Sequence, residues 1–243
     1  MRLLLLSNST APGHGPLEHA RAEIADALGG ARRMLFVPYA QADHDAYTAA
    51  IAGALAPLGV EVRGAHTADR PAALLEEADA VFIGGGNSFR LLTALHRHGL
   101  IPEIRAKVAA GALYMGSSAG TNMACPTLRT TNDMPIVQPP SFDALGLVPF
   151  QINPHYLDPV PGSTHMGETR AKRIAEFHEE NDVPVLGLRE GTWVRAGQGR
   201  LTLGGVAAGA VLFGRGRAPV EYGPGADLSA LLNTEPAFDS PLG

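Results

Sequence analysis

The segment ALYMGSSAGTNMACPTL, residues 112–128, carries the pattern that decides the fold. A short, mostly apolar run, ALYM, is followed by the small residues GSSAG and then by a stretch that can open a helix. An apolar run of this length, bounded by turn residues, is typical of a buried strand. The segment therefore predicts a strand, a tight turn and a helix, which is the unit that parallel sheets repeat.

The same alternation extends in both directions. Before this segment, strand patterns lie at residues 2–7, 33–40, 60–66 and 80–86, and helical patterns at 16–30, 45–59, 71–78, 88–99 and 101–111. After it come an apolar run at 145–156, a helix at 168–181, a strand at 183–188, a hairpin at 192–205 and a final strand at 210–214. This order predicts a doubly wound α/β fold, with a mostly parallel sheet flanked by helices and antiparallel additions near the C-terminus. The 29 glycines and 19 prolines are spread through turns rather than gathered in a linker, so residues 1–243 are expected to form a single domain.

Composition and charge narrow the class of protein. Of the 243 residues, 45% are hydrophobic and 18% charged, as in ordinary globular proteins. The net charge is −5 and there is no basic cluster, which argues against a nucleic-acid partner. The single cysteine, Cys125, excludes an internal disulfide and is typical of a reducing cytosol. The run of four leucines near the start is too short for a signal peptide, and no segment is long enough to span a membrane, so a cytoplasmic protein is expected.

The small residues after the predicted strand form a candidate nucleophile elbow. Ligands of doubly wound sheets bind beyond the carboxyl ends of the strands, where this turn lies. The pattern G-x-S-x-G fits Gly116, Ser118 and Gly120. Ser118 is therefore predicted to be a nucleophile raised on a strained turn, with Ser117 as a small neighbour, and the helix behind it offers N–H groups to a developing oxyanion. The alternative interpretation is a plain Gly/Ser-rich turn between a strand and a helix.

A second glycine cluster, GGGNSF at residues 84–89, also lies between a predicted strand and a predicted helix. Its amides are candidates for a second oxyanion donor beside the elbow. The G-x-G-x-x-G and Walker patterns of phosphate-binding loops are absent, and a simple tight turn is the alternative.

A serine nucleophile needs a base, and that base needs a third group to orient it. Most of the nine histidines lie in predicted loops or on polar helix faces, but His155 ends an apolar run directly after Pro154. From the residues alone, a histidine buried in the core or in a turn is the alternative for His155. Two acids are candidates for the third group: Glu190 ends a predicted strand before a glycine, and Asp133 lies in a polar loop after the elbow.

Over most of its length the chain resembles the aspartyl dipeptidases of the peptidase E family, serine peptidases whose flavodoxin-like fold is related to class I glutamine amidotransferases. The resemblance covers about residues 1–222 and leaves 223–243 unmatched. It rests on the blocks LLLLSNST, LEHA, LAPLGVEV, GGGNSFRLL, GALYMGSSAGTNMACPTLRTTNDMPIV, FDALGLVPFQINPH, GETRAKRI and GLREGTW. Their length and unusual composition make chance similarity a poor explanation.

The resemblance implies roles for individual residues. Ser118 is the nucleophile, His155 the general base, and Gly86 and Ala119 supply the oxyanion amides. Glu190 and Asp133 both match acidic positions of the family. Glu190 is favoured as the third triad member, because a carboxylate at a strand end can orient an imidazole at a strand end, and Asp133 is then left to hold the elbow loop.

The substrate implied by the resemblance is a dipeptide with an N-terminal aspartate. The substrate carboxylate suits a planar guanidinium, and Arg170 is assigned to it, with Arg173 as a second possibility. Glu168 is assigned to the substrate ammonium. The loop 157–170 is expected to close over the substrate. No cofactor and no metal are expected, and neither is a nucleic acid or a membrane; the oligomeric state is left as monomer or homodimer.

One departure from the family pattern concerns the pocket. Ser117 stands where family members carry a bulky aromatic residue, which predicts a looser pocket wall. Two rival functions stay open on the sequence. One is a hydrolase of the same fold that acts on another aspartyl compound, such as a β-aspartyl peptide or the polymer cyanophycin. The other is a non-catalytic binding protein, which the joint presence of Ser118, His155, Asp133 and Glu190 disfavours.

Overall fold

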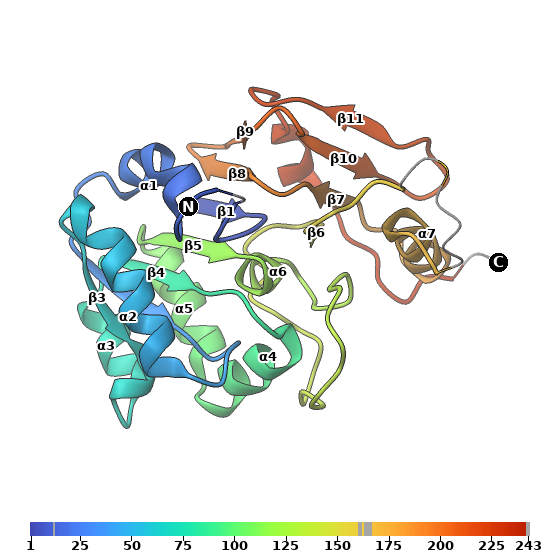
Figure 1. The fold of residues 1–243 in the computed structure, drawn as a ribbon. Helices are drawn as coiled ribbons and strands as arrows, with labels where there is room; N and C mark the ends of the chain where they lie inside the picture. Colours follow the sequence, from blue (N-terminus) through green and yellow to red (C-terminus); the bar gives the residue numbers. More distant parts are fainter. Residues whose placement is uncertain (12, 160–161, 163–166, 242–243) are drawn as a thin grey trace.

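The computed structural model describes residues 1–11, 13–159, 162 and 167–241. Within them, strands and helices alternate along the chain, and the strands form two sheets (Figure 1). The larger sheet has the strand order β3-β2-β4-β5-β1-β8-β9, and the smaller sheet has the order β11-β10-β7-β6. The doubly wound α/β class predicted from the sequence is confirmed.

The seven-stranded sheet is parallel over its first five strands. Strands β8 and β9 extend it as an antiparallel hairpin next to β1, as the pattern at 192–205 predicts. Its strands are β1 (Arg2–Leu6), β2 (Arg33–Val37), β3 (Glu61–Gly64), β4 (Ala80–Ile83), β5 (Leu113–Ser117), β8 (Thr192–Gly197) and β9 (Arg200–Gly205).

The central strands are continuous apolar runs because helices cover both faces of the sheet. In β1, Leu3 and Leu5 pack into one core cluster, while Leu4 and Leu6 pack into another on the opposite face. All four side chains are at most 1% exposed. Burial of each such side chain contributes about 1.5–3 kcal/mol. The run of leucines at the start of the chain is therefore a central strand.

In the described part of the chain, two helices cover one face of the large sheet and four cover the other. The helices α1 and α2 supply side chains to the cluster around Leu4, and α3, α4, α5 and α6 to the cluster around Leu3. Their bounds are α1 (Arg21–Leu28), α2 (His44–Leu55), α3 (Pro71–Glu77), α4 (Ser88–Arg97), α5 (Leu100–Ala109) and α6 (Ala119–Ala124). Short 3₁₀ helices lie at Glu18–Ala20, Ala56–Leu58, Ala65–Thr67 and Ser229–Asn233. Among the described residues, no helix combines the length and the apolar character needed to cross a membrane.

The smaller sheet is built from the second part of the chain and lies beyond β1, toward the right of Figure 1. It comprises β6 (Gln151–Pro154), β7 (Val185–Leu188), β10 (Ala210–Phe213) and β11 (Val220–Tyr222). Strands β6 and β7 are parallel, and the remaining pairs are antiparallel. Helix α7 (Arg170–Glu180) packs against this sheet through Ile174 and Phe177. The predicted C-terminal additions therefore divide between two sheets.

The prediction that the strand at 210–214 is the last one is wrong, because β11 follows it. Strand β11 has three residues and lies at an exposed edge, so it lacks the apolar run by which a strand is recognised in a sequence. The residues after β11 also pack on the molecule: Leu228 and Leu231 belong to the core cluster around Leu3.

Candidate active site

Ser118 lies on a strained turn between β5 and α6. Its backbone angles are φ 53° and ψ −111°, a conformation that side-chain-bearing residues rarely adopt. The Ser118 N–H donates to the Leu6 carbonyl at 3.1 Å, which fixes the turn to the end of β1. Gly120 is required here, because a Cβ at this position would lie 1.9 Å from the Ile83 carbonyl oxygen. The sequence GSSAG therefore has the geometry of a nucleophile elbow rather than that of an ordinary turn.

The side chain of His155 reaches Ser118 from the smaller sheet. His155 follows the end of β6 with φ 52°, and its N–H donates to the Ser7 hydroxyl oxygen at 2.9 Å. That hydroxyl donates in turn to the Leu188 carbonyl at 2.8 Å, at the end of β7. Asn122 of α6 donates its side-chain amide to the Ile152 carbonyl of β6 at 2.9 Å. These contacts hold the ends of the two sheets together at the site.

Three side chains form a linear hydrogen-bonded chain. His155 Nε2 lies 2.9 Å from Ser118 Oγ, and His155 Nδ1 lies 2.6 Å from Glu190 Oε1. With Nδ1–H donated to the carboxylate, Nε2 is left to accept the serine proton. The side chains of His155 and Glu190 are 37% and 46% exposed, so the site is open to solvent. Such an arrangement can deprotonate a serine hydroxyl and store the proton on the imidazole.

The structure separates the two candidate acids. Asp133 does not contact His155; its Oδ2 accepts hydrogen bonds from the N–H of Ser88 at 2.7 Å and from the Ser88 hydroxyl at 2.5 Å. Asn87, the residue before Ser88, caps α4, and its side-chain amide donates to the Met134 carbonyl at 2.9 Å. Asp133 thus fastens the loop after the elbow helix to the start of α4. Of the two acids, Glu190 alone meets the imidazole.

The glycine cluster at 84–89 lies against the elbow. A Cβ on Gly85 would approach the Ser118 Cβ to 3.1 Å. Gly86 has φ +134°, and a Cβ there would lie 2.6 Å from the Ala40 carbonyl oxygen, so only glycine fits. Its neighbours Gly85 and Asn87 donate their N–H groups to protein acceptors, whereas the Gly86 N–H has no acceptor within the described part of the chain. Ala119 is the first residue of α6, where helical N–H groups have no partner inside the helix.

A pocket of about 570 Å³ opens above these residues. Its wall includes Gly86, Ser118, Asp133, His155, Arg170 and Glu190. Among the described residues, no three His, Cys, Asp or Glu side chains are arranged to hold a metal ion.

Arg170 and Glu168 have different places relative to this pocket. Arg170 begins α7 and lines the pocket; burial lowers its pKa, with a smaller contribution from Arg173, while Asp133 acts in the opposite direction. Glu168 is not among the described residues of the pocket wall, and its carboxylate lies 3.7 Å from Arg173 Nε on the surface. The structure therefore does not bring Glu168 to the site. The loop 157–170, predicted to close over a substrate, lies partly outside the described residues.

Three further residues lie in the core or pack against it. Ser117 is fully buried on β5 and does not line the described pocket wall, so the expected loosening of the wall by this residue is not seen. Trp193 packs with the cluster around Leu4. Cys125 is also fully buried, and burial raises the pKa of its thiol to about 12, so it is no competing nucleophile.

Sequence reasoning missed Ser7 and Ser88, since a serine after a strand or before a helix is too common to stand out.

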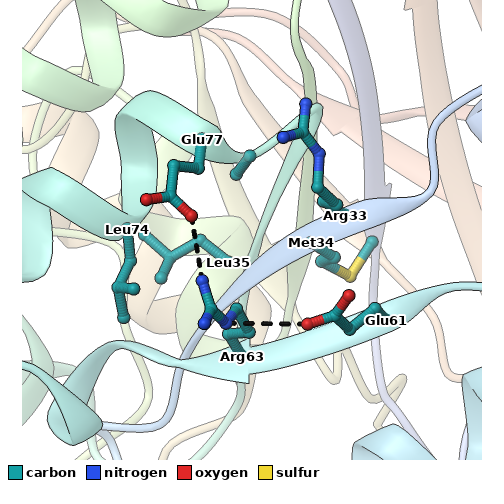
Figure 2. A pocket seen from close by; sticks show the side chains of 8 residues that line it. Arg33, Met34, Leu35, Glu61, Arg63, Leu74 and Glu77 are labelled. Carbon is teal, nitrogen blue, oxygen red and sulfur yellow. Dashed lines mark hydrogen bonds and ion pairs between the residues drawn. The ribbon is translucent and has the colours of Figure 1, made fainter.

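A second hollow, of about 260 Å³, lies at the amino ends of β2 and β3 and has a different character (Figure 2). Figure 2 shows Arg63 between two carboxylates, 2.9 Å from Glu77 and 3.6 Å from Glu61. Arg33 pairs with Asp79 at 2.9 Å. The charges of this hollow neutralise one another, and no serine or histidine lines its described wall. The pocket above Ser118 is therefore the candidate active site.

Comparison with known proteins agrees with this geometry. The model of peptidase family S51 matches residues 3–204. The chain belongs to this family. A Streptomyces coelicolor protein named "Peptidase E" is 62% identical to this chain, over 99% of this chain and 98% of its own length. A Drosophila melanogaster protein named "Probable alpha-aspartyl dipeptidase" is 52% identical over 95% of this chain and 97% of its own length.

The fold is also similar to a solved structure. The crystal structure of a peptidase from an acI-B1 actinobacterium superposes with a TM-score of 0.64 over 93% of this chain and 96% of that chain. The two sequences are 18% identical, so this likeness concerns the fold. Membership of family S51 confirms the resemblance identified from the sequence.

Proposed function

We propose that this chain is a serine dipeptidase that hydrolyses dipeptides with an N-terminal aspartate. The observation that carries the proposal is the contact of His155 with Ser118 on one ring nitrogen and with Glu190 on the other, at 2.9 and 2.6 Å. Membership of family S51 and the names of its relatives support the peptidase class and the aspartyl specificity. Residues 1–243 act as one catalytic domain, since both sheets contribute to the site.

The first half of the reaction forms an acyl-enzyme. Ser118 Oγ attacks the scissile carbonyl carbon while His155 Nε2 takes its proton, and Glu190 stabilises the resulting imidazolium. The developing oxyanion accepts hydrogen bonds from the Gly86 and Ala119 N–H groups. His155 then donates its proton to the leaving amine, the C–N bond breaks, and the second amino acid departs.

The second half uses the same groups with water as the nucleophile. Water enters beside His155, loses a proton to Nε2 and attacks the aspartyl ester of Ser118. The tetrahedral intermediate collapses, aspartate leaves, and the proton returns to Ser118 Oγ. The exposure of His155 and Glu190 leaves an open path for this water.

Specificity for aspartate follows from two opposite charges on the pocket wall. Arg170 receives the substrate carboxylate through paired N–H bonds. Asp133 receives the ammonium: its Oδ2 is bound to Ser88, and its carboxylate lies on the pocket wall in the electrostatic range of Arg170. Asp133 takes the place for which the sequence suggested Glu168. The two charged groups of an N-terminal aspartate are close together and match this pair.

The proposal is tested with purified protein and a panel of substrates. We expect turnover of α-Asp-Leu, with little or no turnover of β-Asp-Leu, Ala-Leu or cyanophycin. Ser118→Ala should abolish turnover, and Ser117→Ala is the matched control, because Ser117 is the adjacent serine and lies in the core. Full activity of Ser118→Ala, or preference for a β-aspartyl or polymer substrate, would overturn the proposal.

Two finer points belong to the same proposal. The single cysteine supports action in the cytoplasm, which is a reducing compartment. The charge of −5 supports a small-molecule substrate rather than a nucleic acid.

A further inference from the structure

Arg189, the residue before the proposed triad acid, is held by an unusually complete set of partners. Its side chain is 14% exposed. Its Nε and Nη2 donate to the two carboxylate oxygens of Asp158 at 2.7 and 2.8 Å. Its Nη1 and Nη2 donate to those of Glu221 at 2.8 and 2.9 Å, and Nη1 also donates to the Ala208 carbonyl at 2.8 Å. A guanidinium has five N–H groups, and all of them are used.

The partners of Arg189 come from three segments that meet beside the site. Asp158 lies three residues after His155, and the guanidinium also lies 5.7 Å from the ring centre of Tyr156, directly after His155. Glu221 lies in β11, outside residues 3–204 that match the family. Arg189 therefore joins the segment that carries the base to the segment that carries the acid, and both to the C-terminal edge strand.

The contacts of Arg189 favour the charged forms of the guanidinium and of its carboxylate partners. The hydrogen bonds to Arg189 lower the pKa of Asp158, and the two carboxylates raise the pKa of Arg189. Bidentate pairs between a guanidinium and a carboxylate restrict orientation as well as distance. Because all five N–H groups are used within the protein, Arg189 has none left for a substrate carboxylate, unlike Arg170.

We propose that Arg189 is a positioning residue that keeps the His155 and Glu190 segments in register for catalysis, and that Glu221 of β11 is part of this device. The inference rests on the proposed function. His155 and Glu190 both lie just beyond strand ends, with half-exposed side chains, so their 2.6 Å contact depends on neighbours that hold the two backbones. Arg189 supplies this support through contacts on both sides.

The test compares Arg189→Met and Glu221→Gln with a matched arginine elsewhere. Arg63 also pairs with two carboxylates, but it lies on β3, an edge strand of the large sheet, and lines the second hollow (Figure 2). For α-Asp-Leu, we expect Arg189→Met to lower kcat by about 10- to 100-fold with KM changed less than about twofold, which is the pattern of a lost transition-state effect. Glu221→Gln should lower kcat by about two- to fivefold. Arg63→Met should leave both constants unchanged.

A double-mutant cycle separates positioning from general loss of folding. If Arg189 acts through Glu190, then Arg189→Met in a Glu190→Gln background should cause little further loss of kcat. Equal losses in both backgrounds would overturn the inference. A second readout is the downfield proton resonance of His155 Nδ1–H, which Arg189→Met should weaken and Arg63→Met should retain.

The failure of this inference is distinguishable from failure of the proposed function. If the wild-type protein does not hydrolyse α-Asp-Leu, the proposed function fails. If it does, and both Arg189→Met and Glu221→Gln keep wild-type kcat, the positioning role alone is refuted. Should Arg189→Met not fold, as judged by thermal melting, Glu221→Gln and its cycle with Glu190→Gln decide the matter.

Discussion

The two sheets contribute different halves of the candidate site, and they hold their residues in different ways. Ser118 lies between β5 and α6 of the large sheet, where buried small residues and a strained backbone set its position. His155 and Glu190 follow the ends of β6 and β7 of the small sheet, and their side chains are half exposed. The nucleophile lies on a partly exposed turn whose neighbours are buried, whereas the base and acid depend on polar contacts between distant segments.

This difference has a consequence for how the site responds to change. The elbow depends on the packing of β5 and α6 and on contacts with the carbonyl groups of Leu6 and Ile83, at the ends of β1 and β4. The orientation of His155 depends on Ser7, which is 148 residues away in the sequence. Variants of the large-sheet half should therefore act through chemistry and packing, and variants of the small-sheet half through alignment.

The largest expected loss of activity tests whether Ser118 of the large-sheet half and His155 of the small-sheet half act as one unit. Ser118→Ala and His155→Ala should each lower kcat for α-Asp-Leu by about 10⁵- to 10⁶-fold, because neither group functions without the other. The double variant should be no worse than either single variant, as measured by steady-state hydrolysis. Multiplicative losses would show that the two sheets contribute independently.

The next effect distinguishes the two acids. Glu190→Gln should lower kcat by about 10³- to 10⁴-fold, because the amide no longer stabilises the imidazolium. Asp133→Asn should instead act mainly on KM for α-Asp-Leu, since Asp133 contacts Ser88 and lines the pocket rather than meeting His155. Kinetic constants for both variants decide this, and a larger kcat loss for Asp133→Asn would reverse the assignment.

A smaller loss of activity is expected when the glycine loop at residues 84–89 is changed. Gly86→Ala should lower kcat by about 10²- to 10³-fold, because the loop must move away from the Ala40 carbonyl and its amide leaves the oxyanion. Gly13→Ala is a control with a positive φ but no Cβ clash, far from this loop in sequence. Wild-type kcat for Gly86→Ala would exclude its amide from the reaction.

A variant of Ser7 tests the contacts that hold the small-sheet half of the site. Ser7→Ala removes the acceptor of the His155 N–H and the donor to Leu188 in a fully buried position. Unfolding free energy should fall by about 1–3 kcal/mol, the cost of leaving a buried polar group unpaired. Urea titration measures this change in unfolding free energy. The loss of kcat in Ser7→Ala should be smaller than the loss in Glu190→Gln. An unchanged midpoint would mean that Ser7 does not hold this half.

The smallest effect is expected at Cys125. Burial raises the pKa of its thiol from an ordinary value of 9.0 to about 12 in the folded protein. Deprotonation then favours the unfolded chain, so stability should fall as pH rises between these two values. At pH 8, a thiol reagent should label the protein only after denaturation and should leave activity unchanged. Rapid labelling of the native protein with loss of activity would contradict the burial of this residue.

The sequence by itself determined the class of fold and the order of its elements down to β10, and it offered Ser118 and His155 as candidates for the nucleophile and the base. These signals are local: apolar runs bounded by turns, glycines that no other residue can replace near Ser118, and a histidine that ends an apolar run. Each is a pattern within a short stretch of chain, so the residues alone make it visible, and the resemblance to the peptidase E family selects Ser118 and His155 from the alternatives.

Only the tertiary structure decided which acid meets His155, that β6, β7, β10 and β11 form a separate sheet, and that Glu168 lies outside the pocket. It also revealed the supporting contacts of Ser7 and Arg189. The sequence favours Glu190 because it follows a strand end, but both acids match acidic positions of the family, and their separation depends on which strand ends lie side by side. That adjacency is set by strand order and register between segments far apart in the chain, and no single segment contains it.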